Sequence, residues 1–337
     1  MLASFYEGNH TFSVSEKSIT QPKTGEVQIK VAYCGVCGTD VHIYHGMMDK
    51  RVQKPMTIGH EMSGTIEALG DGVEGFSIGE KVVVRPLDNR AEKPSDKGFS
   101  HICKDLKFIG IDSPGAMQQY WNVPAFTLHK LPANTDLKLA ALVEPLSVAC
   151  HDVRLSELVS DEVAVVLGGG PIGMLVAMVA KNKGARVIIS EVNPVRVALA
   201  KELGFETVNP AEINIVEFIE RETEGKLADV VFEVAGVQPT VDLMSDIAGI
   251  RSRIVMVAIH GQPKNVNLYQ FFWKELKLIG ARVYEKEDYD EAIRLVTANE
   301  MPFEKMITKV APLKDIQNVF QNIDKNPDGM KVLLDCQ

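Results

Sequence analysis

The strongest limit on how this chain can fold is set by a glycine-rich turn between an expected strand and an expected helix. Five apolar residues, Val163–Leu167, lead directly into Gly168-Gly169-Gly170-Pro171-Ile172-Gly173, and a further apolar run follows. In such a unit Gly168 allows a tight turn, Gly170 lets a pyrophosphate approach the backbone, and Gly173 lets the helix pack closely. The segment predicts a parallel β-α-β unit that holds a dinucleotide at the N-terminus of its helix, with a plain turn as the alternative.

An acidic residue follows at the spacing that a dinucleotide site requires. Glu191 ends the next apolar strand, 18 residues beyond Gly173. Its carboxylate can accept hydrogen bonds from the adenosine ribose hydroxyls and would repel a 2′-phosphate, which favours NAD over NADP. Arg196 lies close enough in sequence to weaken that preference. The alternative is that Glu191 is only a solvated strand end.

The rest of the chain divides into two patterns. Up to about residue 135, short β-branched runs such as Val27–Val31 alternate with Gly, Pro and Asp turns, which predicts a mainly β domain. From Leu139, apolar helices alternate with buried strands, as in a doubly wound parallel sheet with helices on both faces. A chain of 337 residues is long enough for two such domains. The segment after Ala281, with a closing strand at Lys331–Leu334, is compatible with either one.

Charge and composition limit the class of partner. A formal net charge of −9 argues against binding to nucleic acid, which needs a basic face, and favours a small-molecule partner. The N-terminus lacks the features of a signal peptide, so we expect a cytoplasmic protein. The uncharged run from Val163 to Ala180 is broken by glycines and a proline, so we expect a strand, a turn and a buried helix there and no membrane span. Five scattered cysteines make a disulfide framework improbable.

Candidate metal ligands come from three separate segments. Cys37 closes a Cys-x-x-Cys pair with Cys34, His60 and Glu61 are adjacent, and Glu144 lies in an apolar run. Three sulfur, nitrogen or oxygen ligands with one open position are typical of catalytic zinc. Neighbours on a strand point to opposite faces, so His60 and Glu61 can share one ion only across an irregular turn. Half of a structural zinc site, a redox cysteine pair, and an exposed helix-start acid at Glu144 are the alternatives.

Three residues beside Cys37 suit supporting roles. Asp40 can hold a histidine ligand by its free N–H, as metal sites commonly require. The Thr39 hydroxyl and the His42 imidazole suit a path for a substrate proton. The remaining histidines lack a partnering motif, and we expect surface or satisfied core positions for them; they are His10, His45, His101, His129, His151 and His260.

Four motifs in this order resemble those of a known family. Gly35–His42, Ile58–Gly64, Val143–Ala149 and the glycine turn are similar to those of the zinc-dependent medium-chain dehydrogenases of the alcohol dehydrogenase superfamily. The similarity is greatest to the branch of sorbitol, threonine and sugar-acid (galactonate-type) dehydrogenases, and it extends to Leu334. It implies a GroES-like catalytic domain of residues 1–145 and 284–337, with a Rossmann NAD-binding domain, residues 146–283, inserted between them. It also implies a homodimer or homotetramer joined through the Rossmann domains.

The resemblance implies a role for each candidate residue. Cys37, His60 and Glu61 would bind catalytic zinc, Glu144 would be a direct or water-mediated fourth ligand, and the Thr39 and His42 pair would relay the proton. The reaction would oxidise a secondary alcohol to a ketone, with zinc as the Lewis acid and NAD as the hydride acceptor. A zinc-free quinone or enal reductase on the same fold and a non-catalytic NAD-binding protein are the alternatives.

One stretch departs from the family pattern. Relatives often carry a lobe with four closely spaced cysteines that hold a structural zinc, whereas Arg85–Phe108 keeps only Cys103. We therefore expect one zinc per subunit and a lobe held by other contacts. The substrate stays open among polyols, sugar acids and hydroxy amino acids. Cations that could recognise an acid are Arg51, Lys274 and Arg282, of which Arg282 lies in a segment that resembles a cleft segment of some relatives.

Overall fold

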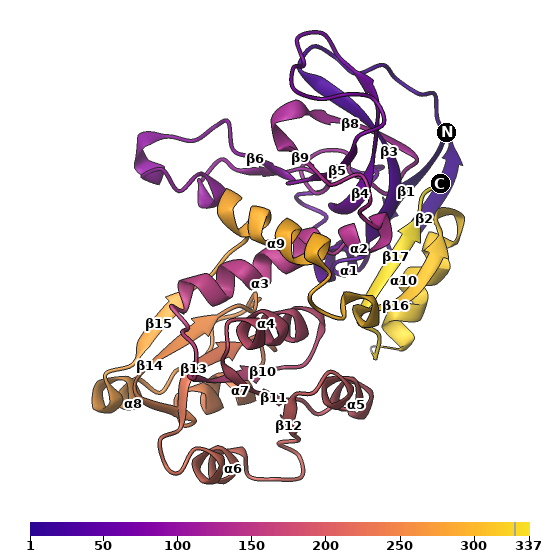
Figure 1. The fold of residues 1–337 in the computed structure, drawn as a ribbon. Coiled ribbons are helices and arrows are strands. Elements are labelled where there is room, and N and C mark those ends of the chain that lie inside the picture. The colour runs from indigo at the N-terminus through magenta and orange to yellow at the C-terminus, as the bar shows by residue number, and fades with distance from the viewer. Residues whose placement is uncertain (327) are drawn as a thin grey trace. The chain divides into compact units, whose positions relative to one another are not determined.

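The computed structural model describes residues 1–326 and 328–337, which divide into two compact units (Figure 1). Unit 1 contains Met1–Glu144 and Tyr289–Gln337, and unit 2 contains Pro145–Asp288. The boundaries fall inside two helices, α3 (Val143–Leu155) and α9 (Lys286–Ala298). The segment after Asp288 therefore returns to the first unit, which the residue pattern alone had left open.

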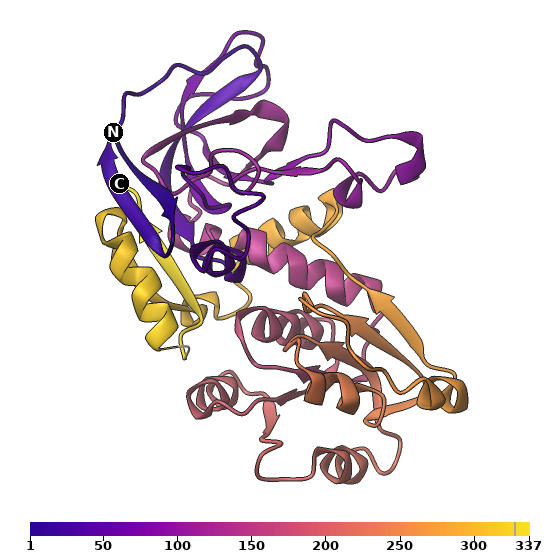
Figure 2. The same cartoon turned by 180° about the vertical axis from the view of Figure 1, so that it is seen from behind.

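Unit 1 is built around a sheet in the order β16-β17-β3-β4-β5-β9, with β8 also paired to β3. Its strands are β3 (Glu26–Gly35), β4 (Glu61–Leu69), β5 (Lys81–Val84), β8 (Tyr120–Pro124), β9 (Leu128–Lys130), β16 (Ile307–Pro312) and β17 (Lys331–Asp335). β17 pairs antiparallel with β3, with Leu334 opposite Cys34. The two ends of the chain lie near each other in both views (Figure 1, Figure 2).

Helices and short strands complete unit 1. They are β1 (Leu2–Gly8), β2 (Thr11–Glu16), β6 (Leu87–Asp88), β7 (Lys107–Phe108), α1 (Gly38–Tyr44), α2 (Leu137–Ala140) and α10 (Ile316–Lys325). Phe320 of α10 packs on Phe12 of β2 and on Tyr44 of α1, with ring centres 4.6 Å and 5.2 Å away. The three rings belong to one buried core, so the returning tail is held by apolar packing as well as by strand pairing.

Unit 2 is a parallel sheet in the order β12-β11-β10-β13-β14-β15, with helices α4 to α8 between its strands (Figure 1). The strand order reverses between β10 and β13. The strands are β10 (Val163–Leu167), β11 (Arg186–Ser190), β12 (Glu206–Val208), β13 (Ala228–Glu233), β14 (Ala248–Met256) and β15 (Lys277–Gly280). The helices are α4 (Pro171–Asn182), α5 (Pro194–Glu202), α6 (Ile215–Glu222), α7 (Gln238–Met244) and α8 (Leu268–Lys274).

The sequence of unit 2 explains these elements locally. β10 is almost entirely buried, as a central parallel strand must be, and the run from Val163 to Ala180 forms β10, the turn and most of α4. Pro171 occupies the first turn of α4, and the Asn193 side chain caps α5 by accepting from the next backbone N–H groups. None of the helices in the part of the chain described here is long and apolar enough to cross a membrane.

Candidate functional site

The side chains of Cys37, His60 and Glu61 come together where β3 ends and β4 begins. The two strands are antiparallel neighbours, with Gly35 opposite Glu61, which brings Cys37, two residues beyond β3, close to the start of β4. One ligand atom from each of the three side chains lies within 4.8 Å of the others. Sulfur, nitrogen and oxygen donors at this spacing form a set suited to zinc. We call these three residues the metal group.

The turn at Gly59 lets two adjacent residues share the metal group. Gly59 has φ = +103°, and β4 begins only at Glu61, so His60 lies outside the strand. The two side chains are therefore not forced to opposite faces of the sheet. A Cβ at position 59 would lie only 2.6 Å from Met117 Cγ and 2.9 Å from Cys34 Sγ. Glycine is required here both by the backbone angle and by the space.

Asp40 connects Cys37 with His60. Cys37 caps the N-terminus of α1, and its backbone N–H donates to Asp40 Oδ2 at 2.9 Å. The other carboxylate oxygen, Oδ1, lies 3.7 Å from His60 Nδ1, and both side chains are buried. Because Nδ1 of His60 faces the carboxylate, Nε2 is left for a metal, as in the carboxylate–histidine–metal arrangement common to such sites.

The charges of this arrangement suit a bound cation. Burial disfavours a charged His60 ring, but Asp40 and Cys37 raise the pKa of His60 from 6.5 to about 10. Burial raises the pKa of Asp40 from 3.8 to about 6, against the effect of His60. Asp40 Oδ1 and His60 Nδ1 are shielded from water and have no hydrogen-bond partner among the described residues. The acidic groups that favour a protonated His60 ring would equally favour a metal ion in place of that proton, so the residues of the metal group fit a bound cation.

Lys331 is a part of this site that the sequence analysis did not single out. It begins β17 and is almost fully buried, and its Nζ donates to Glu61 Oε1 at 2.7 Å and to Val36 O at 3.0 Å. Burial lowers the pKa of Lys331, but Glu61 and Cys37 outweigh that effect and raise it. The lysine therefore neutralises Glu61. Its sequence signal was a charged residue directly before the apolar run Val332–Leu334.

The other predicted site residues of unit 1 lie around the metal group. Glu144, the second residue of α3, is buried and outside the group of atoms within 4.8 Å, although its charge raises the pKa of His60 and of Lys331. Thr39 N donates to Cys37 Sγ at 3.5 Å. Thr39 is half-buried and His42 is exposed, three residues further along α1. Residues three apart share one face of a helix, so the pair leads from the metal group toward solvent.

The glycine turn of unit 2 has the geometry of a phosphate-binding turn. Gly168 has φ = +112°, Gly170 is the N-cap of α4, and Pro171 and Ile172 form its first turn. A Cβ on Gly173 would lie 1.9 Å from the carbonyl oxygen of Gly168. Only glycine therefore lets α4 start this close to the strand, with its first backbone N–H groups available to a pyrophosphate.

Glu191 faces this turn from the end of β11. Its Oε2 accepts from Gly169 N at 2.8 Å, and its Oε1 accepts from Val192 N and Asn193 N. Arg196 Nη1 lies 3.9 Å from Glu191 Oε2. The structure thus brings together the glycine turn, the acidic residue and the arginine that the sequence pointed to. A carboxylate fixed at this place can bind ribose hydroxyls.

The lobe of residues 85–108 is held by polar contacts. Asn89 Nδ2 donates to Ser100 Oγ at 2.7 Å, Arg90 pairs with Asp88 at 2.6 Å, and Lys93 pairs with Asp105. The lone lobe cysteine, Cys103, is buried and is not in a cluster of possible metal ligands among the described residues. Cys34, partner of Cys37 in the Cys-x-x-Cys pair, is a buried core residue of β3.

A second cluster of possible ligands lies in unit 2. His151, Glu285 and Asp288 have ligand atoms within 4.8 Å of one another. Arg154 donates to both carboxylates, and His151 Nδ1 lies 2.7 Å from Asp288 Oδ2. Because a guanidinium already neutralises these carboxylates, we interpret the cluster as a buried salt-bridge network that joins the start of α9 to α3.

Two of the three cations considered for substrate recognition are engaged elsewhere. Arg51 forms two hydrogen bonds of 2.6 Å with Asp112. Lys274 Nζ donates to three backbone carbonyls, those of Ser245, Asp246 and Ala248. Arg282 is exposed and, unlike the other two, has no hydrogen-bond or ion-pair partner within residues 1–326 and 328–337.

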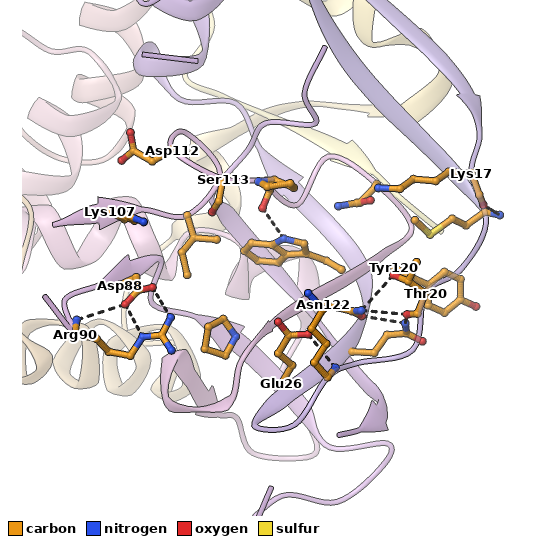
Figure 3. Close-up of a pocket in the computed structure, with 18 residues that line it drawn as sticks. Lys17, Thr20, Glu26, Asp88, Arg90, Lys107, Asp112, Ser113, Tyr120 and Asn122 are labelled. Carbon is orange, nitrogen blue, oxygen red and sulfur yellow. Dashed lines mark hydrogen bonds and ion pairs between the residues drawn. The ribbon is translucent and has the colours of Figure 1, made fainter. Parts of the chain in front are cut away.

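A cavity of about 480 Å³ lies on unit 1 (Figure 3), and no residue of the metal group lines it. Its lining includes Lys17, Lys107, Tyr120 and Asn122 but none of the predicted site residues. Part of its charge is already paired, since Asp88 binds Arg90. We therefore do not assign the chemistry to this cavity.

Taken together, the fold and the site define a zinc-binding dehydrogenase. Residues 23–133 match the family model of the alcohol dehydrogenase GroES-like domain, and residues 171–298 match that of the zinc-binding dehydrogenases. The chain belongs to this family of zinc-type medium-chain alcohol dehydrogenases. The predicted combination of a GroES-like domain and a Rossmann domain is confirmed.

Relatives match over nearly the whole chain. A 2-dehydro-3-deoxy-L-galactonate 5-dehydrogenase of Pseudoalteromonas atlantica is 56% identical over 100% of this chain and 99% of its own. A sorbitol dehydrogenase of Halalkalibacterium halodurans is 33% identical over 97% of this chain and 96% of its own. The solved structure of a putative zinc-binding dehydrogenase of Sinorhizobium meliloti 1021 with NADP bound is 28% identical in sequence. The match covers 99% of this chain and 98% of that one, with a TM-score of 0.92.

These comparisons confirm the predicted class of enzyme. The protein is an oxidoreductase of the alcohol and polyol dehydrogenase type, which works with zinc and a nicotinamide cofactor. The family match and the relatives named as sugar-acid and polyol dehydrogenases favour this class over the two alternatives considered from the sequence, a zinc-free reductase and a non-catalytic NAD-binding protein.

Proposed function

We propose that this enzyme oxidises a secondary hydroxyl of a sugar acid to a ketone, with NAD as hydride acceptor. The metal group of Cys37, His60 and Glu61, supported by Asp40, carries the chemical part of this proposal. The choice of a sugar acid is supported by the 56% identical relative, whose name specifies a deoxygalactonate substrate. We propose 2-dehydro-3-deoxy-L-galactonate, or a sugar acid of similar size, as the substrate.

Cys37, His60 and Glu61 would hold one zinc ion per subunit, and Glu144 would act as a direct or water-mediated fourth ligand. When bound, zinc supplies Lewis-acid catalysis to an alcohol oxygen, and the nicotinamide accepts the hydride. Asp40 would hold the His60 ring in place through Nδ1. The Thr39 hydroxyl would take the substrate proton and pass it toward His42, which is exposed to water on the same helix face.

Unit 2 would bind NAD. The turn containing Gly168, Gly170, Pro171, Ile172 and Gly173 would take the pyrophosphate, and Glu191 would bind the adenosine ribose. The carboxylate of Glu191 supports NAD as the preferred cofactor, because a 2′-phosphate would meet its negative charge. In domain terms, we propose residues 1–145 with 284–337 as the catalytic domain and 146–283 as the NAD-binding domain.

We further propose that the lobe of residues 85–108 holds no structural zinc. The ion pair of Lys93 with Asp105, the pair of Arg90 with Asp88, and the stacking of the Arg90 guanidinium over Phe126 at 5.1 Å take over its stabilisation. A single thiolate, that of Cys103, is too few ligands for the closed four-ligand sites that structural zinc uses.

An apolar patch on unit 2 supports assembly into a homodimer or homotetramer. The exposed side chains of Leu268, Tyr269, Phe272 and Trp273 on α8 lie in sequence just before Leu278 on β15, which is one of the two edge strands of the sheet. Exposed apolar patches and unpaired edge strands commonly mark interfaces. Because both features belong to the same short segment, we propose that a second copy of the chain covers it.

The function is tested by following NADH formation with 2-dehydro-3-deoxy-L-galactonate, sorbitol, butanediol and threonine, and by measuring the zinc content. We expect turnover of the sugar acid, loss of turnover on chelation, recovery with added zinc, and one zinc per chain. Turnover that survives complete zinc removal would overturn the metal's role. A preference for sorbitol or threonine would overturn the substrate assignment alone, and two zinc ions per chain would overturn the proposal for the lobe.

The assembly is tested by light scattering on Phe272→Glu, with Ile78→Glu as the matched control. Both residues are exposed apolar side chains, but Ile78 lies in unit 1, away from the patch in sequence. We expect the first variant to shift the mass toward the monomer and the second to leave the mass unchanged. An unchanged mass in Phe272→Glu, or a monomeric wild type, would exclude the patch as the interface.

A further inference from the structure

The order of strands in unit 2 separates the two halves of a bound dinucleotide, if the cofactor lies as proposed above. Glu191 follows β11 on one side of the glycine turn, and β13 and β14 lie on the other side. A dinucleotide binds across the carboxyl ends of the strands, at the point where the strand order reverses. With the adenosine half at Glu191 and the pyrophosphate at the turn, the nicotinamide half must lie over the ends of β13 and β14.

A fully buried carboxylate ends β13 at this place. Glu233 is its last residue, and Glu233 Oε1 accepts from Gly236 N at 2.8 Å and from Thr240 Oγ1 at 2.7 Å. Glu233 Oε2 faces His260 Nε2 at 3.3 Å. A carboxyl group in so dry a position needs a polar partner, and His260 is the side chain that the structure brings to Oε2.

The backbone fixes this pair beside the glycine turn. Val257 N and Ala258 N, just after β14, both donate to the Glu233 carbonyl oxygen at 3.0 Å. A Cβ on Gly236 would lie 3.2 Å from Ala258 Cβ, and a Cβ on Gly168 would lie 3.1 Å from Ala235 Cβ. The turns that follow β10, β13 and β14 are therefore in contact, and His260 belongs to the same edge of the sheet as the phosphate turn.

His260 is only partly satisfied by Glu233. Its side chain is 19% exposed, yet neither ring nitrogen has a hydrogen-bond partner among the residues that the structure describes. The 3.3 Å contact with Glu233 is an ion pair without hydrogen-bond geometry. Buried nitrogens without a partner are unusual in native proteins and call for a ligand or a bound water. The expectation from the sequence that His260 is a satisfied core or surface residue is therefore wrong.

We propose that His260 binds the nicotinamide half of the cofactor, and that Glu233 is the residue that positions it. An imidazole that donates to a carboxylate through one nitrogen presents its other nitrogen as an acceptor when the ring is neutral and as a donor when the ring is protonated. The ribose hydroxyls of this half of the cofactor both donate and accept, so they can pair with either form. A rotation of the partly exposed ring would turn this second nitrogen to the cofactor and keep Glu233 as a partner of the first.

The proposal is tested by the binding of two ligands to the full-length protein, measured by calorimetry. NADH contains both halves of the dinucleotide, whereas ADP contains only the adenosine half and the pyrophosphate. We expect His260→Ala to raise the Kd for NADH about tenfold, the loss of one hydrogen bond, and to leave the Kd for ADP unchanged. Glu233→Gln should show the same selectivity with a smaller effect, and His260→Gln, which keeps a donor, should recover part of the affinity.

His45→Ala is the matched control, because His45 is also paired with a carboxylate, Asp324 at 2.8 Å, but lies in unit 1. It should bind both ligands as the wild type does. Unchanged NADH binding in His260→Ala would overturn the proposal, and so would an equal loss of NADH and ADP binding, which would indicate a disturbed unit 2. A wild type that binds neither ligand would overturn the proposed cofactor site itself.

Discussion

At the scale of single residues, the metal group and its buried neighbours Asp40 and Lys331 form a balance of charges. Cys37, Glu61 and Asp40 contribute acidic groups, and Lys331 and His60 contribute basic ones. Glu61 is buried and paired with Lys331 in the structure. The lysine thus supplies positive charge to a carboxylate that is also a candidate zinc ligand, so it is expected to matter most when the metal is removed.

Replacing Lys331 by Met leaves the buried carboxylate of Glu61 without a cation. In chelated protein we expect the free energy of unfolding to fall by about 3–5 kcal/mol, the usual cost of removing one partner of a buried ion pair. With zinc bound, the loss should be smaller because the metal ion also neutralises Glu61. Urea unfolding with and without zinc measures both values. Lys331→Arg is the control that keeps the charge, and an equal loss in both states would contradict the pairing.

Replacing Cys37 by Ala removes the sulfur ligand of the metal group. We expect zinc to be lost and turnover to fall by more than about 100-fold. A loss of up to about 100-fold is typical when a residue that only hydrogen-bonds to a metal ligand is replaced. NADH affinity should persist, because the glycine turn belongs to unit 2. Cys34→Ala is a matched control, since Cys34 is a buried core cysteine outside the metal group. Elemental analysis of the zinc content distinguishes the two variants. If Cys37→Ala retained its zinc, Cys37 would not be a metal ligand.

At the scale of elements, α3 and the start of α9 are joined by the network around Asp288. Burial alone would raise the pKa of Asp288, but hydrogen bonds from Arg154 and His151 hold it well below its ordinary value of 3.8. The folded state therefore favours the ionised carboxylate. This contribution to stability is complete above about pH 4 and is lost as the pH falls through the folded-state pKa.

The Asp288→Asn variant tests that network. At neutral pH we expect a loss of about 1–3 kcal/mol in the free energy of unfolding, because hydrogen bonds to charged groups are lost from a buried site. The difference from the wild type should stay constant near neutral pH. It should shrink as the pH falls below about 4, where the unfolded wild type becomes protonated at Asp288 while the folded carboxylate still resists protonation. Urea unfolding across this range measures it. Asp290→Asn, a change at a more exposed carboxylate in unit 1, is the comparison.

At the scale of the whole molecule, the metal group and the glycine turn belong to different compact units. Cys37, His60 and Glu61 lie in Met1–Glu144, and the residues from Gly168 to Glu191 lie in Pro145–Asp288. Each ligand should therefore stabilise mainly the unit that binds it, since a ligand stabilises the folded state in proportion to its binding free energy.

Hydrogen exchange with mass spectrometry checks this division. On chelation we expect faster exchange in peptides that contain Cys37, His60 or Lys331, and unchanged exchange in peptides from β10 to β11. Addition of NADH should slow exchange in the peptides of the glycine turn and in those around Glu233. Uniformly faster exchange throughout the chain on chelation would show instead that the two units unfold as one cooperative body.

The sequence by itself determined the fold class and the chemical class of the protein. Both depend on local patterns: the glycine turn after an apolar strand, the alternation of strands and helices, and the types of the candidate ligands. The spacing of apolar residues reflects the period of a strand or a helix. A phosphate-binding turn requires glycine at fixed positions, so it can be recognised from the sequence. The family comparisons confirmed these inferences, while the roles of the individual site residues stay predictions.

Only the tertiary structure decided which distant side chains become partners. Lys331 reaches Glu61 across 270 positions, Asp288 reaches His151 across 137, and His260 meets Glu233 from the turn after a neighbouring strand. None of these pairs follows a period or a motif. They form because strand order and the return of the tail bring the segments together. Burial then makes an unpaired polar or charged group costly, so each side chain is stabilised by its partner.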